Sequence, residues 1–221
     1  MPRPSAGTRT NPIVEDSQAV EHLRAADPVM GDLLEAYEAP DGVLQRRGRR
    51  PTDAYGALLR AIVGQQLSTK AARTIYERLT GLFEGRTPTP AEIVAADPDH
   101  LRSAGLSRAK VAYLRDLAER VEDGDLDLDR ISELPDEDVI EQMTAVKGLG
   151  AWTVHMFLIF HLGRPDVLPV GDLGIRNAAL KAYGLRKLPQ PARLERLARP
   201  WRPHRSLASL YLWRSLDNEP A

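Results

Sequence analysis

The chain has 221 residues, no cysteine, and 30 basic against 31 acidic side chains for a formal net charge of -1. This length allows one substantial core or two lobes and excludes a large multidomain assembly. The absence of cysteine excludes disulfides, thiolate zinc sites and four-thiolate iron–sulfur clusters.

The chain starts MPRPSAGTRTNP, a polar run rich in proline, glycine and threonine, so we expect residues 1–15 to be a disordered leader. No apolar run approaches the roughly 20 residues that cross a bilayer, and the leader lacks the apolar core of a signal peptide. We therefore expect a cytoplasmic protein, associated with the nucleoid if the organism is bacterial.

Apolar residues recur at helical spacing along most of the remaining chain. We predict a helix from about Ser17, one over 52–64 and one after an N-cap at Ser68. Further helices are expected after Ser107, over 135–143, after the 146–150 turn, and over 173–183, 191–198 and 205–216. No segment indicates a strand. The expected fold class is all-α, with residues 16–221 forming two helical lobes around a cleft and no N-terminal β domain.

Charge is unevenly distributed along the chain. Residues 115–142 carry a net charge of -9, and we expect this stretch to face solvent, away from any phosphate. Residues 171–214 carry +8, which suits an anion-binding face. Ordinary solvated helix faces explain both runs equally well, so charge alone does not decide between these interpretations.

Two short motifs are candidates for function. Lys147, Gly148, Leu149 and Gly150 join two expected helices, and two glycines allow the backbone to approach a phosphate closely. An ordinary helix C-cap and turn is the alternative. Asp172 precedes a helix and is placed to be its N-cap. Held ionised by the helix N-terminus and Arg176, it would also be able to stabilise a cationic sugar or orient a water.

The order of four segments, LLRAIVGQQLS, KGLGAWT, LPVGDLGIR and WRPHRSLASLYLW, resembles the helix-hairpin-helix superfamily of DNA glycosylases, in the branch of 3-methyladenine DNA glycosylase II. The resemblance spans about residues 50–216. It implies a base excision repair enzyme that flips alkylated purines of the 3-methyladenine and 7-methylguanine type out of double-stranded DNA, hydrolyses the N-glycosidic bond and leaves an abasic site.

The resemblance assigns a role to each motif. Asp172 matches the catalytic aspartate. The hairpin, extended to Thr153, matches the segment that binds the DNA backbone. The carbonyls of Thr144, Val146 and Gly148 match a site for a monovalent cation, Na⁺ or K⁺. No other cofactor, and in particular no nucleotide cofactor, is implied. We expect a monomer that does not bind membranes.

Trp152 occupies the position at which relatives with strand-cutting activity carry a Schiff-base lysine, so the resemblance implies a monofunctional enzyme. Its indole would be a stacking wall for a flipped base, with core packing as the alternative. Gln66 and Leu67 match the turn that fills the gap in the duplex, although a plain interhelical turn is also consistent.

Two positions, Lys147 and Met156, depart from the usual pattern of the family. Lys147 replaces a proline, which would loosen the turn while adding a positive charge. Met156 replaces a pocket aromatic residue and leaves the range of accepted bases open. His204 stands where a second pocket aromatic is common, and a surface role is equally consistent. The other histidines, His22, His100, His155 and His161, lack metal-ligand spacing.

Two other functions remain open from the sequence. One is a non-catalytic helix-hairpin-helix module that binds DNA structures and does not need Asp172. The other is a glycosylase for oxidised or mismatched bases, against which the missing cysteines and the missing lysine both argue.

Overall fold

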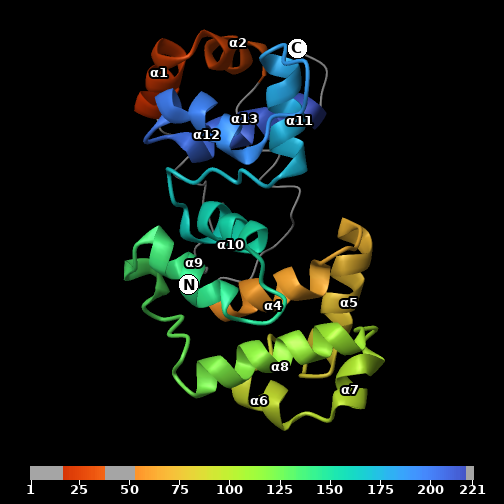
Figure 1. The fold of residues 1–221 in the computed structure, drawn as a ribbon. Helices are drawn as coiled ribbons and strands as arrows, with labels where there is room; N and C mark the ends of the chain where they lie inside the picture. The colour runs from red at the N-terminus through yellow and green to blue at the C-terminus, as the bar shows by residue number, and fades with distance from the viewer. Residues whose placement is uncertain (1–16, 38–52, 218–221) are drawn as a thin grey trace, which may run out of the picture. The chain divides into compact units, whose positions relative to one another are not determined.

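The computed structural model describes residues 17–37 and 53–217, and the expected leader at 1–15 lies outside them. Helices form the regular structure throughout these ranges, and no strand occurs in them. The predicted all-α class is therefore confirmed for the described chain (Figure 1). None of the helices in these ranges combines the length and apolar character that spanning a membrane requires.

The chain divides into two compact units. The described residues of the first unit are 17–37 and 162–217, so two segments from opposite ends of the chain build it. The second unit is continuous, over residues 53–161.

The continuous unit contains seven of the described α-helices and two irregular helical turns. They are α4 (Ala54–Gly64), α5 (Thr69–Gly81), α6 (Pro90–Ala95), α7 (Pro98–Ser103), α8 (Arg108–Glu122), the 3₁₀ turn η1 (Ile131–Glu133), α9 (Asp136–Thr144), α10 (Ala151–Phe157) and the π-helical turn η2 (Leu158–Leu162), which ends one residue past the unit. Helix α8 packs against α4, α6 and α7, and α10 packs against α4 and α9. The buried Leu58, Ile62, Leu114 and Leu117 belong to the core that these packings form.

Side-chain caps fix the first turns of α4 and α5. Asp53 accepts the amide of Gly56 at 2.6 Å, and the Ser68 hydroxyl accepts the amide of Ala71 at 3.3 Å. Both satisfy amides that would otherwise lack a partner at a helix start. The predicted end of α4 at Gly64 and the predicted N-cap at Ser68 are confirmed.

Helix α5 carries a stripe of apolar side chains that is only partly buried, formed by Ala71, Ala72, Ile75, Tyr76 and Leu79. Leu79 is its one fully buried member, whereas Ala72 and Ile75 are only half-buried. Ala72 also lines a cavity together with Thr69 and Arg73. The stripe therefore borders an open space along part of its length.

The first unit combines α1 (Ser17–Ala26) and α2 (Pro28–Ala36) with α11 (Leu173–Ala182), α12 (Pro191–Leu197), the 3₁₀ turn η3 (Arg199–Trp201) and α13 (Arg205–Asp217). A buried carboxylate, Asp27, joins the two segments. Its Oδ2 accepts the hydroxyl of Tyr183 at 2.5 Å and the indole N–H of Trp201 at 2.8 Å, while its Oδ1 accepts the amide of Val29 at 2.9 Å. These bonds satisfy polar groups that are costly to bury alone.

Candidate functional site

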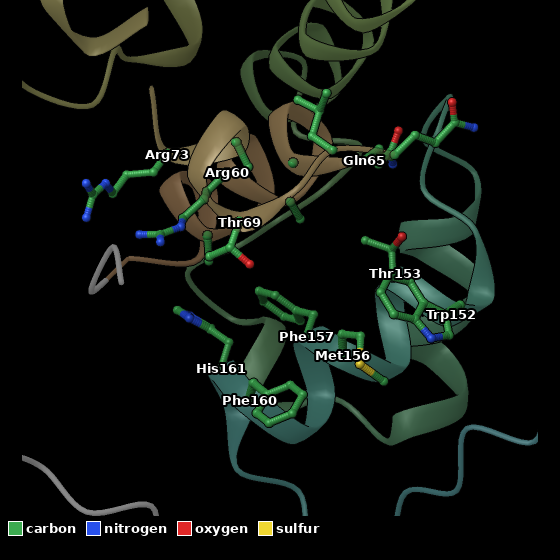
Figure 2. A pocket seen from close by; sticks show the side chains of 16 residues that line it. Arg60, Gln65, Thr69, Arg73, Trp152, Thr153, Met156, Phe157, Phe160 and His161 are labelled. Atoms are coloured by element: carbon green, nitrogen blue, oxygen red, sulfur yellow. The ribbon is translucent and has the colours of Figure 1, made fainter. Parts of the chain in front are cut away.

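A cavity of about 440 Å³ lies within the continuous unit. Its lining comes from α4, α5, the turn between them, α10 and η2. Figure 2 shows Trp152, Thr153 and Met156 on one side, Arg60 and Arg73 on the other, and Phe157 between them. The Arg60 guanidinium lies 5.9 Å from the centre of the Tyr76 ring, and the Phe157 and His161 rings stack at 4.7 Å. Apolar surface with a few polar groups at its edge is typical of sites for small organic ligands.

Trp152 and Met156 lie one helical turn apart on α10 and both line this cavity. Trp152 is 48% exposed, whereas Met156 is only 6% exposed. The core-packing interpretation of Trp152 is therefore wrong, because a core tryptophan is largely buried. The cavity has an accessible aromatic surface beside a flexible thioether.

The turn Gln65–Gln66–Leu67 forms another part of the lining. Gln66 has a φ of +57°, which is uncommon for a residue with a side chain. Leu67 is 37% exposed and is one of the more exposed large apolar side chains of the described chain. An exposed leucine next to a backbone in the left-handed region agrees with insertion into a duplex, and that role of the turn stays a prediction.

The glycine hairpin precedes α10. Gly148 has a φ of +82°, and a Cβ placed there would lie 2.3 Å from Cδ2 of Tyr113, so the ring of Tyr113 packs directly on this backbone. Leu149 and Thr153 are buried, and Gly150 is the N-cap of α10 with no side chain to cap it. The positive φ and the ring contact explain why glycine is required at position 148.

One acidic side chain of the stretch 115–142 is buried, although we expected the stretch to face solvent. Asp116 is 8% exposed, and its carboxylate accepts the backbone amide of Lys147 at 2.9 Å, the Lys147 ammonium at 2.9 Å and the Arg120 guanidinium at 3.0 Å. Burial alone would raise the pKa of Asp116, but these hydrogen bonds outweigh it and lower the pKa. The expectation that the whole stretch faces solvent is wrong at this residue.

This carboxylate also explains how a lysine stands before the first hairpin glycine. The Lys147 amide that bonds to Asp116 would not exist in a proline. The carboxylate therefore fixes the turn that the sequence led us to expect to be loose, and part of the lysine's positive charge is neutralised by an ion pair.

Two of the three carbonyls expected to hold a monovalent cation already accept hydrogen bonds. The Val146 carbonyl accepts the Leu149 amide at 3.1 Å, and the Gly148 carbonyl accepts Nε2 of Gln65 at 2.6 Å. Each keeps a second lone pair for an ion. The cation stays a prediction, together with the Thr144 carbonyl.

Asp172 is the N-cap of α11, as predicted, and is 9% exposed. Its Oδ1 accepts the Ile175 amide at 2.7 Å and the indole N–H of Trp213 at 2.9 Å. Arg176, expected to support the charge of Asp172, donates its Nε to the Pro189 carbonyl at 2.8 Å. The carboxylate is thus oriented by one local bond and one bond from a distant helix.

The loop that leads to Asp172 is fixed by the first turn of α13. Arg205 donates to Asp166 through Nε at 2.6 Å and through a terminal nitrogen at 3.0 Å, a two-point ion pair. Ser206 donates its hydroxyl to the Arg164 carbonyl at 2.7 Å and accepts the Val167 amide at 2.9 Å. Helix α13 therefore holds both Asp172 and the loop before it.

His204 is half-buried next to His22, and the two ring centres lie 5.3 Å apart. The Nε2 atom of His22 is 3.0 Å from the Pro200 carbonyl oxygen. A pocket role for His204 stays a prediction.

Sequence reasoning missed several residues of the site. The helix predicted over 205–216 gives no indication of the bond from Trp213 to Asp172. Tyr113, Asp116 and the bond from Gln65 to Gly148 had no signal in the pattern, because their partners lie 31 to 83 positions away. Helical periodicity reports which face is buried and does not name the partner.

Comparison with known proteins gives a consistent result. The family model described as "HhH-GPD superfamily base excision DNA repair protein" matches residues 59–203. "DNA-3-methyladenine glycosylase 1" of Schizosaccharomyces pombe is 37% identical over 171 residues, which cover 76% of this chain and 75% of that protein.

Two solved structures share the fold. A 3-methyladenine DNA glycosylase of Schizosaccharomyces pombe in complex with abasic DNA aligns with a TM-score of 0.73 at 34% identity, over 89% of this chain and 95% of the other. A DNA-3-methyladenine glycosidase of Bacillus halodurans aligns with a TM-score of 0.80 at 35% identity, over 92% and 91% of the two chains. The chain described above belongs to the HhH-GPD superfamily of base excision DNA repair proteins.

Proposed function

We propose that this chain is a monofunctional DNA glycosylase, a hydrolase that excises alkylated purines from double-stranded DNA and leaves an abasic site. The observation that carries the proposal is the half-exposed Trp152 in the wall of an otherwise largely apolar cavity of about 440 Å³. Membership of the repair superfamily and the names of the relatives point to the same reaction.

The cavity supplies a surface for a flipped base. An alkyl group on N3 or N7 makes a purine cationic, and an electron-poor ring stacks favourably on an indole. Because the charged base is already a good leaving group, it needs few polar contacts for protonation. The buried Met156 adapts its shape to ligands of different outline, which favours a range of alkylated bases.

Asp172 supplies the carboxylate. Cleavage of an N-glycosidic bond passes through an oxocarbenium-like sugar, which a carboxylate stabilises electrostatically while it orients or deprotonates the attacking water. The bonds from Ile175 and Trp213 fix the orientation of this group. Preorganisation matters because a carboxylate that must reorient loses part of its effect on the transition state.

In this proposal the hairpin binds the DNA backbone through residues 147–150 and Thr153. Gln66 and Leu67 fill the space left by the extruded nucleotide. Positive φ at Gly148 and Gln66 and the exposure of Leu67 support these roles. The monomeric state, the cytoplasmic location and a cation at the hairpin carbonyls remain parts of the proposal. No chemical step described here requires the cation.

The test is release of free base from duplexes that each contain one defined lesion. We expect 3-methyladenine and 7-methylguanine to be released, and Asp172→Asn to lower the rate by at least about a hundredfold while DNA binding stays within about twofold. An Asn variant with wild-type activity would refute the role of Asp172. Release from 8-oxoguanine or mispaired DNA alone would instead favour an enzyme for oxidised or mismatched bases, and binding without release would favour a non-catalytic module.

The same reactions test the absence of lyase chemistry. Because the Trp152 indole has no primary amine to form a Schiff base, the abasic product should remain unnicked until alkali is added. A covalent protein–DNA complex trapped by borohydride would contradict this.

A further inference from the structure

One face of α8 contacts both of the segments proposed to touch DNA. Lys110, Tyr113 and Asp116 lie at intervals of three along this helix and so share a face. The Lys110 ammonium donates to the carbonyls of Val63 at 2.7 Å and Gln65 at 2.9 Å. Gln65 begins the wedge turn, residues 65–67, which contains the two residues proposed to enter the duplex. Tyr113 and Asp116 contact the hairpin, as described above.

Gln65 connects the two segments directly. Its side-chain Nε2 donates to the Gly148 carbonyl at 2.6 Å across 83 positions of sequence. The backbone carbonyl of Gln65 accepts a hydrogen bond from Lys110. Gln65 thus binds the hairpin with its side chain and α8 with its backbone.

The next residue, Gln66, needs such support. A φ of +57° in a residue with a side chain is less favourable than the ordinary helical or extended regions, and it persists when the surroundings fix the neighbouring backbone. Lys110 fixes the backbone by binding the carbonyls of Val63 and Gln65, both of which precede Gln66.

We propose that Gln65 and Lys110 are positioning residues that hold the wedge turn at a set offset from the hairpin, so that backbone binding places Gln66 and Leu67 for insertion. The inference rests on the proposed glycosylase function and adds a requirement to it. Insertion compensates for the stacking and pairing lost when a base leaves the duplex. Its efficiency therefore depends on where the wedge lies relative to the bound phosphates.

The experiment compares two DNA substrates that differ in the work of extrusion. One duplex carries 7-methylguanine paired with cytosine, and the other carries the same lesion in a one-nucleotide bulge, where the cost of extrusion is partly removed. Single-turnover rates of base release are measured for the wild type, Gln65→Ala and Lys110→Met. Lys110→Arg keeps a cationic donor, and Gln142→Ala on α9 is the matched glutamine control.

We expect Gln65→Ala, which loses one hydrogen bond, and Lys110→Met, which loses two, each to lower the rate on the paired duplex by roughly tenfold or more. On the bulge, we expect both to lower the rate by less than about twofold. Lys110→Arg should recover most of the paired rate, and Gln142→Ala should change neither rate. Because the Gln65 bond is exposed, the midpoint of thermal unfolding of Gln65→Ala should stay close to that of the wild type.

Equal losses on both substrates, or an unchanged paired rate in Gln65→Ala, would overturn the inference and leave the proposed function intact. If the wild type releases no base from either substrate while it still binds both, the proposed function fails and the inference fails with it. The two failures are therefore distinguishable.

Discussion

Asp172 and Trp213 lie 41 positions apart in sequence, yet the indole N–H is 2.9 Å from the carboxylate. The two side chains leave no room for a side chain at Gly174, where a Cβ would lie 3.0 Å from Asp172 Oδ1 and 3.2 Å from the Trp213 ring. Glycine at position 174 therefore lets the ring and the carboxylate meet. The orientation of the Asp172 carboxylate therefore depends on a side chain from α13.

This contact predicts that loss of the Trp213 donor lowers the rate of base excision without weakening DNA binding. Trp213→Phe keeps an aromatic ring but removes the N–H donor, so we expect single-turnover excision to fall by about tenfold while the Kd for DNA changes by less than about twofold. Quench-flow kinetics and a binding titration on an abasic duplex measure the two effects. A matching loss of affinity and rate would show that Trp213 serves mainly to hold DNA.

The sequence predicts the N-cap role of Asp172 but not its contact with Trp213, and both results have the same physical reason. An N-cap is a local device, in which a short polar side chain bonds to an amide three residues later, so its pattern is visible in the chain. A tertiary hydrogen bond has no fixed spacing. The exposure of Trp152 was likewise not readable from periodicity, which places it at a helical position without saying what faces it.

At the scale of elements, the structure shows that α8 supports the hairpin through a charged contact. Asp116 accepts the Lys147 amide, and this bond depends on the backbone N–H that every residue except proline carries. The side chain of Lys147 is 71% exposed, so its own ion pair contributes little.

Two substitutions at Lys147 should therefore differ. Lys147→Pro removes the amide and leaves the buried carboxylate with fewer donors, so the free energy of unfolding should fall by about 1–3 kcal/mol. Lys147→Ala keeps the amide and should cost less than about 1 kcal/mol. Chemical denaturation measures both. An equal loss for Lys147→Pro in an Asp116→Ala background would attribute the effect to the proline ring instead of the lost bond.

The prediction of elements succeeded where long periodic segments carry cap signals, as at α4, α5, α8 and α11. It missed the short helices α2, α6 and α7, although each begins with a capping side chain followed by proline. The six residues of α6 and the six of α7 are too few for a helical period to show. The prediction also missed the π-helical turn after Phe157, because an apolar run in the sequence does not distinguish an α-helical from a π-helical backbone.

At the scale of the whole molecule, the two units carry opposite charge. The acidic run 115–142 lies within the continuous unit, and the basic run 171–214 lies within the other. Most of the basic side chains are exposed, including Lys181, Arg186, Arg193 and Arg196. A duplex bound by such residues releases counterions, so affinity for DNA should weaken steeply with salt.

Protonation of His155 gives a pH dependence of stability. Burial lowers the pKa of His155 below its ordinary value, and Asp136 only partly offsets this. The unfolded chain therefore takes up the proton first, so the contribution of His155 to stability is complete above about pH 6.5 and is lost as pH falls through the lowered pKa.

We expect the midpoint of thermal unfolding to drop between pH 7.5 and 5.5, and to drop less in His155→Gln, in which this group no longer titrates. The exposed His100 on α7 provides the control, and His100→Gln should follow the wild-type pH dependence. An identical pH dependence in His155→Gln and the wild type would rule out His155 as the source.

The division of the first unit between two distant segments has a consequence for biosynthesis. Residues 53–161 are contiguous, so their partners are all available once that stretch has left the ribosome. By contrast, Asp27 can accept its hydrogen bonds from Tyr183 and Trp201 only after these residues have been translated, 156 and 174 positions later. The nascent polypeptide must therefore carry Asp27, between α1 and α2, without these two donors through most of its translation.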